Sequence, residues 1–203
     1  MLCFPHPNRA APMSSRPEHI PPLYDSFALY GSGVTLVAVR DVPGDQDRFF
    51  IAASVLTSSV NPFTIALSVG QDRDALPLIT AGAPWAVSVL SVHHLPLVRL
   101  LTARTTRAER LDALGAAGAE VSPEGPLWLP DALVTLWCTT HATMPLHDQL
   151  LLVGSVLRGS SHQADLPLLR WNRDFHTVAE LPNGEAAIPS RRRPVTSLTT
   201  ELS

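Results

Sequence analysis

The stretch RFFIAASVLTSSVNPFTIALSV, residues 48–69, contains the pattern that decides the fold. Apolar, β-branched and aromatic residues fill 48–56 and 63–69, which is typical of two β-strands, and Pro62 stands between them. The middle of the stretch, Thr57-Ser58-Ser59, is small and hydroxylated. Two interpretations stay open: an edge strand entering a turn whose hydroxyls cap backbone groups, or backbone N–H groups and hydroxyls that bind a flat, polar ligand.

Further strands are predicted on both sides of this stretch. Residues 33–40 pair with 48–56 across a turn at 42–47, and more strands follow at 85–91, 132–143 and 149–158. A short helix is expected at 73–82, two helical patterns at 93–118, a loop at 123–131, and a short helical or extended element at 167–178. Because strands outnumber helices and no regular βαβ spacing occurs, the pattern predicts a mainly β, antiparallel barrel or sandwich with helices in the connections.

Length and composition indicate one domain with an ample core. The chain has 203 residues, of which 45% are hydrophobic and 16% are charged. We expect a disordered leader at 1–20, the domain at 21–182 and a disordered tail at 183–203, with Met1 or Met13 as the start. No apolar run approaches the roughly 20 residues of a membrane-spanning helix, and the start lacks the apolar region of a secretory signal, so we expect a cytoplasmic protein with no membrane partner.

The basic residues exclude some kinds of chemistry. The chain has no lysine, which rules out a Walker A loop and a lysine Schiff base, so anions must be bound by arginine, backbone N–H groups or hydroxyls. The net charge is −3, and the short basic run at 191–193 is typical of a solvated tail. We therefore expect no nucleic-acid partner.

Cysteine and histidine give no metal or disulfide pattern. Cys3 lies in the expected leader and Cys138 in a strand, where a buried apolar role is favoured over a nucleophile. Adjacent residues on a helix point about 100° apart, so His93 and His94 are not expected to chelate, and no metal site is predicted. The remaining histidines of the domain are scattered, and GxGxxG, GxSxG, HExxH and CxxC are all absent.

Five segments in order resemble the flavin reductase-like family, the FMN-binding split barrels that serve as reductase components of two-component monooxygenases. The third of them precedes helical residues, and the fourth contains an Asp followed six residues later by Gly-x-Val. The segments are SFALYGSGVTLVAVRD (26–41), RFFIAASVLTSSVNPFTIALSV (48–69), PWAVSVLSVHHLPLVRLL (84–101), ALVTLWCTTHATMPLHDQLLLVGSV (132–156) and PLLRWNRDF (167–175).

The resemblance implies an antiparallel split β-barrel that acts as an NAD(P)H-dependent flavin reductase. It implies FMN as cofactor, with FAD possible, NADH or NADPH as electron donor, a homodimer, and a partner monooxygenase that receives reduced flavin. His147, Asp148 and Gln149 would line the site as catalytic candidates, and Arg73 would bind the flavin phosphate. The full set implied to bind the cofactor is Ser54, Val55, Leu56, Thr57, Ser58, Ser59, Arg73, Ser88 and Arg173.

Three departures from the family pattern keep other functions open. Asn61-Pro62 replaces a paired proline, Ser88 replaces an asparagine, and Gln149 replaces a histidine, so that an amide stands where a proton carrier is expected. His147 could substitute for the missing histidine. The alternatives are a flavin- or haem-binding protein of the same fold without efficient NAD(P)H oxidation, and an unliganded barrel that serves as an interaction module.

Overall fold

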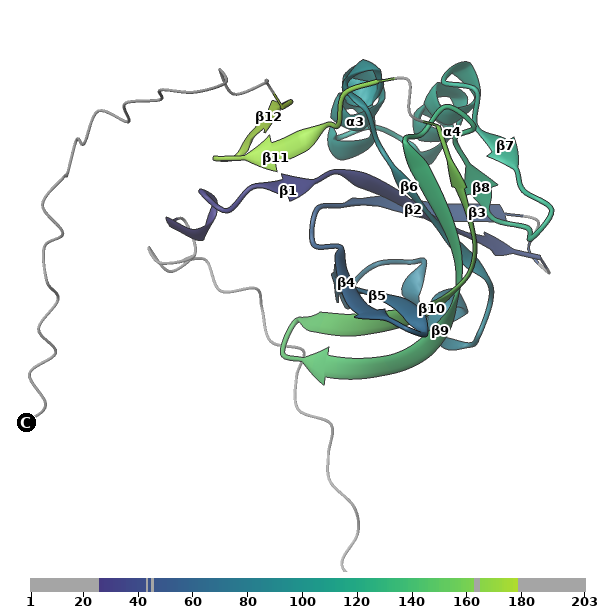
Figure 1. Cartoon of the computed structure of the whole chain (residues 1–203). Helices are drawn as coiled ribbons and strands as arrows, with labels where there is room; N and C mark the ends of the chain where they lie inside the picture. Colours follow the sequence, from purple (N-terminus) through teal and green to yellow (C-terminus); the bar gives the residue numbers. More distant parts are fainter. Residues whose placement is uncertain (1–25, 43, 45, 163–164, 179–203) are drawn as a thin grey trace, which may run out of the picture.

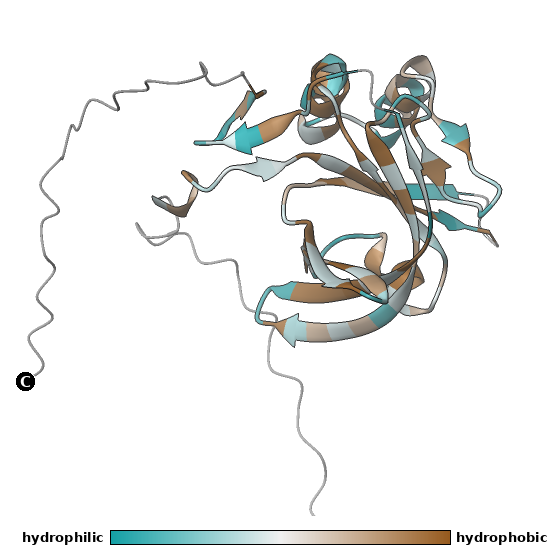
Figure 2. Ribbon diagram, viewed as in Figure 1, coloured by the Kyte–Doolittle hydropathy of each residue, from teal (hydrophilic) through white to brown (hydrophobic). Residues whose placement is uncertain are grey.

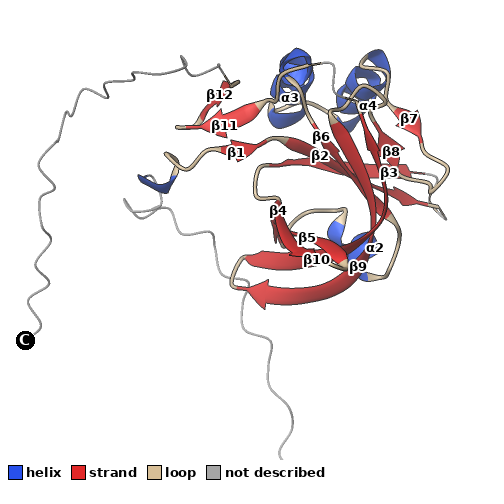
Figure 3. Ribbon diagram, viewed as in Figure 1, coloured by secondary structure: helices blue, strands red, loops and turns tan. Residues whose placement is uncertain are grey.

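A computed structural model describes residues 26–42, 44, 46–162 and 165–178 of the chain (Figure 1). The expected leader at 1–20 and tail at 183–203 lie outside the described residues. The centre of the described chain is one strongly curved sheet, with two helices at one end and a short helix at the other (Figure 3).

The large sheet has seven antiparallel strands in the order β3-β2-β6-β9-β10-β5-β4. The edge strands β3 and β4 do not pair with each other, so the curved sheet stays open between them as a split barrel. Sequence reasoning thus predicted the fold class correctly. The strands are β2 (Thr35–Asp41), β3 (Gln46–Ala52), β4 (Leu56–Val60), β5 (Phe63–Gly70), β6 (Trp85–Val89), β9 (Val134–Leu146) and β10 (Gln149–Ser161).

Two smaller sheets flank the large one. The first joins β1 (Ser32–Gly33), β11 (Leu169–Trp171) and β12 (Asp174–His176), so the ambiguous segment at 167–178 is extended. The second is a hairpin of β7 (Glu120–Val121) and β8 (Leu127–Trp128) that encloses part of the expected loop at 123–131.

The core lies on both faces of the sheet, and β2 shows why this strand is apolar throughout. Val37 and Val39 point into the barrel interior, whereas Leu36 and Ala38 point to the helices, because successive side chains of a strand alternate between faces. The interior cluster also contains Trp85 and residues from β5 and β10. Apolar residues accordingly follow the inner parts of the strands, and polar ones gather at turns and outer ends (Figure 2).

Glycine is required at one close approach inside the barrel. A Cβ atom added to Gly154 of β10 would lie 2.4 Å from Cζ2 of the Trp85 ring. The register between β9 and β10 shifts at Val153/Gly154 and again at Val156/Arg158, and such bulges bend a strand. The bends let β9 and β10 run through both halves of the barrel. These two strands are longer than the strands predicted at 132–143 and 149–158.

The helices occupy the predicted connections. The short helix is α2 (Leu76–Thr80), and the 93–118 segment contains the single-turn η1 (Val92–His94), α3 (Leu95–Thr102) and α4 (Arg107–Ala116). Thr106 begins α4 with a capping box, in which its hydroxyl accepts the Glu109 N–H and the Glu109 carboxylate accepts the Thr106 N–H. No helix in the described part of the chain is long and apolar enough to span a membrane.

Candidate functional site

A cavity of about 190 Å³ opens where β3 ends and β5 and β10 meet. Several small side chains line it, which brings the backbone within reach of a ligand, and Arg73 is the one arginine among the lining residues. The lining residues are Phe50, Ile51, Ala52, Ala53, Ser54, Ser68, Val69, Gly70, Asp72, Arg73 and Gln149.

Ser54 links the β3–β4 connection to β5 beside this cavity. Its hydroxyl donates to the Ser68 carbonyl at 2.9 Å and accepts the Ser68 N–H at 3.2 Å. The prediction that the second strand extends over 48–56 was therefore wrong at its end. The strand stops at Ala52, because the chain crosses to β4 through Ala53–Val55 and Ser54 bonds to β5 there.

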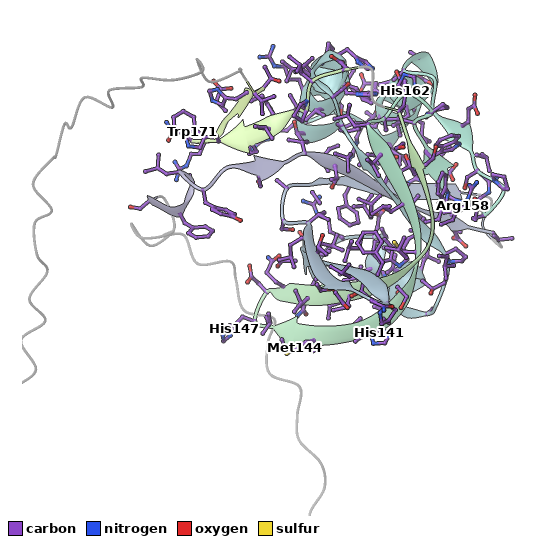
Figure 4. All side chains as sticks on the ribbon, viewed as in Figure 1. His141, Met144, His147, Arg158, His162 and Trp171 are labelled. Atoms are coloured by element: carbon purple, nitrogen blue, oxygen red, sulfur yellow. The ribbon has the colours of Figure 1, made fainter. Side chains whose placement is uncertain are left out.

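Gln149 reaches the cavity from the start of β10. Its Oε1 accepts from the Ser68 hydroxyl at 3.4 Å, and its Nε2 donates to Asp148 Oδ2 at 3.2 Å. Ser54, Arg73 and Gln149, which lie far apart in the sequence, thus line one cavity. Asp148 and His147 lie in the turn between β9 and β10, and Figure 4 shows His147 at the outer end of this hairpin.

The hydroxyls at 57–59 lie in the edge strand β4 and do not line the cavity. Ser58 Oγ bonds Thr64 Oγ1 of β5 at 2.8 Å, at a register shift between Thr57 and Ser59. The edge-strand part of the first interpretation is confirmed, but the hydroxyl of Ser58 bonds a side chain and not a backbone group. Binding of flavin by these residues stays a prediction. Leu56 is exposed on the same strand, and Val55 packs against the interior cluster.

Two other predicted flavin contacts also lie away from the cavity. Ser88 is 1% exposed, and its hydroxyl bonds Thr135 Oγ1 at 3.1 Å in the middle of the sheet. Arg173 lies in the turn between β11 and β12, which belongs to another sheet. The sequence around Ser88 resembles the family pattern, but a pattern of this kind does not show that the Ser88 side chain points into the core.

Sequence reasoning missed Ser68, Gly70 and Asp72 as cavity residues. A signal was present, because the apolar strand FTIAL passes directly into the polar run Ser68-Val-Gly-Gln-Asp-Arg. A change from apolar to polar residues at the end of a strand indicates where that strand leaves the core. Strand pairing brings Gln149 of β10 to the same cavity, because Gln149 lies opposite Gly70 of β5.

A second polar cluster lies at the start of α3, where the expectation that the His93 and His94 rings point about 100° apart was wrong. Their ring centroids are 4.0 Å apart, and both rings bond the Asp131 carboxylate: His93 Nε2 at 2.9 Å and His94 Nε2 at 3.1 Å. The reason is local, because Ser91 Oγ bonds the Nδ1 atoms of both rings and draws them to the same side of η1. Helical spacing alone therefore predicted the wrong directions for the His93 and His94 rings.

Hydrogen bonds fix the protons of this second cluster. The Ser91 N–H donates to His94 Nδ1 at 3.1 Å, so this nitrogen is an acceptor and Nε2 carries the hydrogen that is donated to Asp131. A hydrogen-bearing Nε2 offers no lone pair to a metal. The ligand atoms of His93, His94 and Asp131 lie within 4.8 Å of one another, yet this bonding favours a proton-sharing network over a metal centre.

Charges within the second cluster are strongly coupled. The hydrogen bond to Asp165, at 2.6 Å, raises the pKa of His93, whereas burial lowers the pKa of His94. The bond from His93 lowers the pKa of Asp165 to about 2. Burial opposes ionisation of Asp131, but the hydrogen bonds from the two histidines lower its pKa. His93 is therefore the cation of this cluster.

Cys138 has the buried, structural character that the sequence indicates. It is fully buried in β9, and burial raises the pKa of its thiol to about 12. A thiol with such a pKa stays protonated near neutral pH and is a weak nucleophile. Cys3 lies outside the described residues.

Comparison with known proteins identifies the family. The model of the flavin reductase like domain matches residues 27–179. The chain belongs to the flavin reductase-like family. An NADH:riboflavin 5'-phosphate oxidoreductase from Streptomyces pristinaespiralis is 30% identical over 154 residues, which are 75% of this chain and 85% of that relative. The resemblance seen in the five segments is thereby confirmed.

Two further proteins show how far the likeness extends. The reductase component of a Thermus thermophilus 4-hydroxyphenylacetate 3-monooxygenase is 25% identical, over 76% of this chain and 93% of that relative. Among solved structures, the NADH:FAD oxidoreductase of Streptomyces globisporus C-1027 superposes with a TM-score of 0.69 at 22% identity, covering 85% of this chain and 99% of that one. This structural likeness supports the split-barrel fold.

The cavity suits part of a flavin. Its lining is polar and built of small residues, and its rim carries Arg73, the type of cation that binds phosphate in a bidentate manner. Ligand pockets usually measure about 300–1,000 Å³, so a cavity of about 190 Å³ encloses only a portion of such a molecule. The rest of the flavin would lie outside this pocket.

Proposed function

We propose that this member of the flavin reductase-like family oxidises NAD(P)H and reduces FMN, with FAD as a possible alternative. The observation that carries the proposal is the joining of Ser54, Arg73 and Gln149 around one polar cavity, in a chain that shares 30% identity with an NADH:riboflavin 5'-phosphate oxidoreductase. A bound flavin supplies the chemistry of hydride acceptance. The nicotinamide loses a hydride, and the proton needed to complete reduction comes from solvent.

The residues of this chain bind and orient the reactants. Arg73 would hold the flavin phosphate, and Ala53, Ser54 and Ser68 would lie beside the polar part of the molecule. Donors held in a partly dry groove stabilise the negative charge that reduction adds to the ring. Gln149 supplies an amide N–H and cannot carry a proton, so it contributes hydrogen bonding only.

Exposed apolar side chains near the barrel opening support a homodimer. Val60 is 82% exposed and Leu56 56% exposed on the edge strand β4, and Met144 and Leu146 are exposed at the end of the β9–β10 hairpin (Figure 4). A second copy over this face would cover these side chains and enlarge the small cavity. Light scattering of the purified protein and of Val60→Asp tests this proposal, and a monomeric wild type contradicts it.

The reduced flavin would leave for a partner monooxygenase in the cytoplasm. This part of the proposal is supported by the Thermus thermophilus relative, which is named as the reductase component of a monooxygenase. Flavin bound through an open, shallow cavity can exchange readily with solution, as a diffusing product must.

The test is oxidation of NADH and of NADPH by the purified full chain, with FMN, FAD or no flavin added. We expect turnover that depends on added flavin, and the best pair of substrates names the donor and the acceptor. A protein that binds flavin without oxidising NAD(P)H would support the second candidate, a flavin carrier, which the amide at Gln149 favours. A protein with no affinity for flavin would overturn both.

A further inference from the structure

The turn between β9 and β10 accepts hydrogen bonds from a residue that follows the end of β5. β9 ends at Leu146 and β10 begins at Gln149, so His147 and Asp148 form a two-residue connection. His147 has a φ of 53°, in the left-handed region that costs a residue with a side chain about 1–2 kcal/mol. Such a connection keeps its conformation only when neighbouring groups fix it.

Gln71, directly after β5, supplies these neighbouring groups. Its Nε2 donates to the carbonyl oxygens of His147 and Gln149, both at 3.0 Å, and its backbone N–H donates to the Asp148 carbonyl at 3.0 Å. A side-chain amide has two N–H hydrogens and the backbone has one. All three donors of Gln71 are therefore used on three consecutive carbonyl groups of the turn.

The position of Gln71 connects two parts of the cavity rim. Asp72 and Arg73 follow it in the chain and line one part, and Gln149 lines another. Gln71 itself does not line the cavity. We propose that Gln71 is a positioning residue that locks the β9–β10 turn and so sets the Gln149 side chain over the flavin cavity.

This inference rests on the proposed function, because Gln149 has a task only if the cavity binds flavin. Two substitutions separate the role of the donors from that of shape. Gln71→Met keeps the length of the side chain and removes both N–H donors. Gln71→Glu also keeps the shape, but it places a carboxylate against carbonyl oxygens at neutral pH. Gln46→Met makes the same chemical change at the exposed start of β3 and serves as the matched control.

We expect Gln71→Met to lower kcat/KM for NADH by about tenfold, the effect of about one to two hydrogen bonds of about 1 kcal/mol each. We expect Gln71→Glu to lower it further, with a loss that shrinks as the pH falls and the new carboxylate takes up a proton. Gln46→Met should leave kcat/KM within about twofold of the wild type, as surface changes usually do.

A double-mutant cycle with Gln149→Ala decides whether Gln71 acts through Gln149. If it does, Gln71→Met changes kcat/KM by less than about twofold in the Gln149→Ala background, because the group being positioned is gone. The same tenfold loss in both backgrounds, or no loss in either, overturns the inference.

Failure of the proposed function would be visible separately, as a wild type that does not oxidise NAD(P)H. In that case the four proteins of the cycle, namely the wild type, Gln71→Met, Gln149→Ala and the double variant, are compared by fluorescence titration with FMN. Hydrogen exchange of the amides at 146–150 is measured in the same proteins. Faster exchange in Gln71→Met and non-additive losses of FMN affinity support the positioning role. Unchanged exchange and additive affinities overturn it.

Discussion

Two polar clusters of this molecule differ in how their donors and acceptors are used. Around His93 and His94, each ring nitrogen already has a partner within the cluster, namely Ser91, Asp131 or Asp165. Around Ser54, Arg73 and Gln149 there is an open polar cavity whose rim carries an exposed guanidinium. The donors and acceptors of the His93–His94 cluster are thus bonded within that cluster. The cluster around Ser54, Arg73 and Gln149 is better suited to a ligand.

A cavity of about 510 Å³ next to the histidine cluster sharpens this contrast. It is larger than the cavity beside Ser54, and its walls are largely apolar residues of α3 and α4: Pro96, Leu97, Leu100, Ala113, Ala116 and Ala117. Size alone would choose this second cavity as the site. The polar lining of the smaller cavity, with Arg73 and Gln149, is the reason for proposing the smaller one.

The largest expected effect concerns the close packing of Gly154 against Trp85 inside the barrel. Gly154→Ala would force a methyl group to within 2.4 Å of the Trp85 ring, and overpacking of this kind costs about 1–3 kcal/mol of unfolding free energy. Chemical denaturation measures this loss. Gly115→Ala is the matched control on the helical side, since nothing lies within 4 Å of the added Cβ and alanine favours a helix. Equal stability of the two variants would show that the barrel wall yields more easily than its packing implies.

The next effect tests which cluster binds flavin. Arg73→Ala should weaken FMN binding about tenfold through loss of charge-assisted hydrogen bonds to phosphate, and should leave riboflavin affinity unchanged. Fluorescence titration measures both affinities. His93→Gln, in the other cluster, should change neither. An equal loss for FMN and riboflavin would refute the phosphate role of Arg73, and a loss in His93→Gln would move the site to the second cluster.

The smallest effect concerns pH and the histidine cluster. The pKa of His93 is raised in the folded state, so its contribution to stability is present below its ordinary value of 6.5 and is lost as the pH rises through the raised value. The pKa of Asp165 is lowered to about 2, so its contribution is present above 3.8 and is lost as the pH falls through about 2. The pair therefore stabilises the fold most between pH 3.8 and 6.5.

Asp165→Asn should accordingly lower the denaturation midpoint more at pH 5.5 than at pH 8.5, by a small margin because solvent screens exposed ion pairs. The lowered pKa of His94 acts in the opposite direction, because the unfolded chain takes up a proton there below 6.5. This contribution and that of Asp131 are present in both proteins and largely cancel in the comparison. A midpoint difference that does not change with pH would show that His93 is not the charged partner of Asp165.

The sequence by itself determined the class of fold and the family. Periodicity placed six of the seven strands of the large sheet and the three helical connections, because burial on both faces of a strand such as β2 makes its whole run apolar. It did not predict β4 as a separate strand. The order of five segments identified the flavin reductase-like family. Three of the residues that the resemblance implied for the site, Ser54, Arg73 and Gln149, line one cavity, and their binding of flavin stays a prediction.

Only the tertiary structure decided which side chains meet. Strand pairing brings Gln149 opposite Gly70 across 79 positions of sequence, and it places Gln71 where its donors reach the β9–β10 turn. The side-chain direction of Ser88, the edge position of Thr57–Ser59 and the convergence of His93 and His94 on Asp131 are likewise set by contacts between distant segments. A local pattern reports the conformation of its own segment, whereas hydrogen-bond partners are chosen by the sheet as a whole.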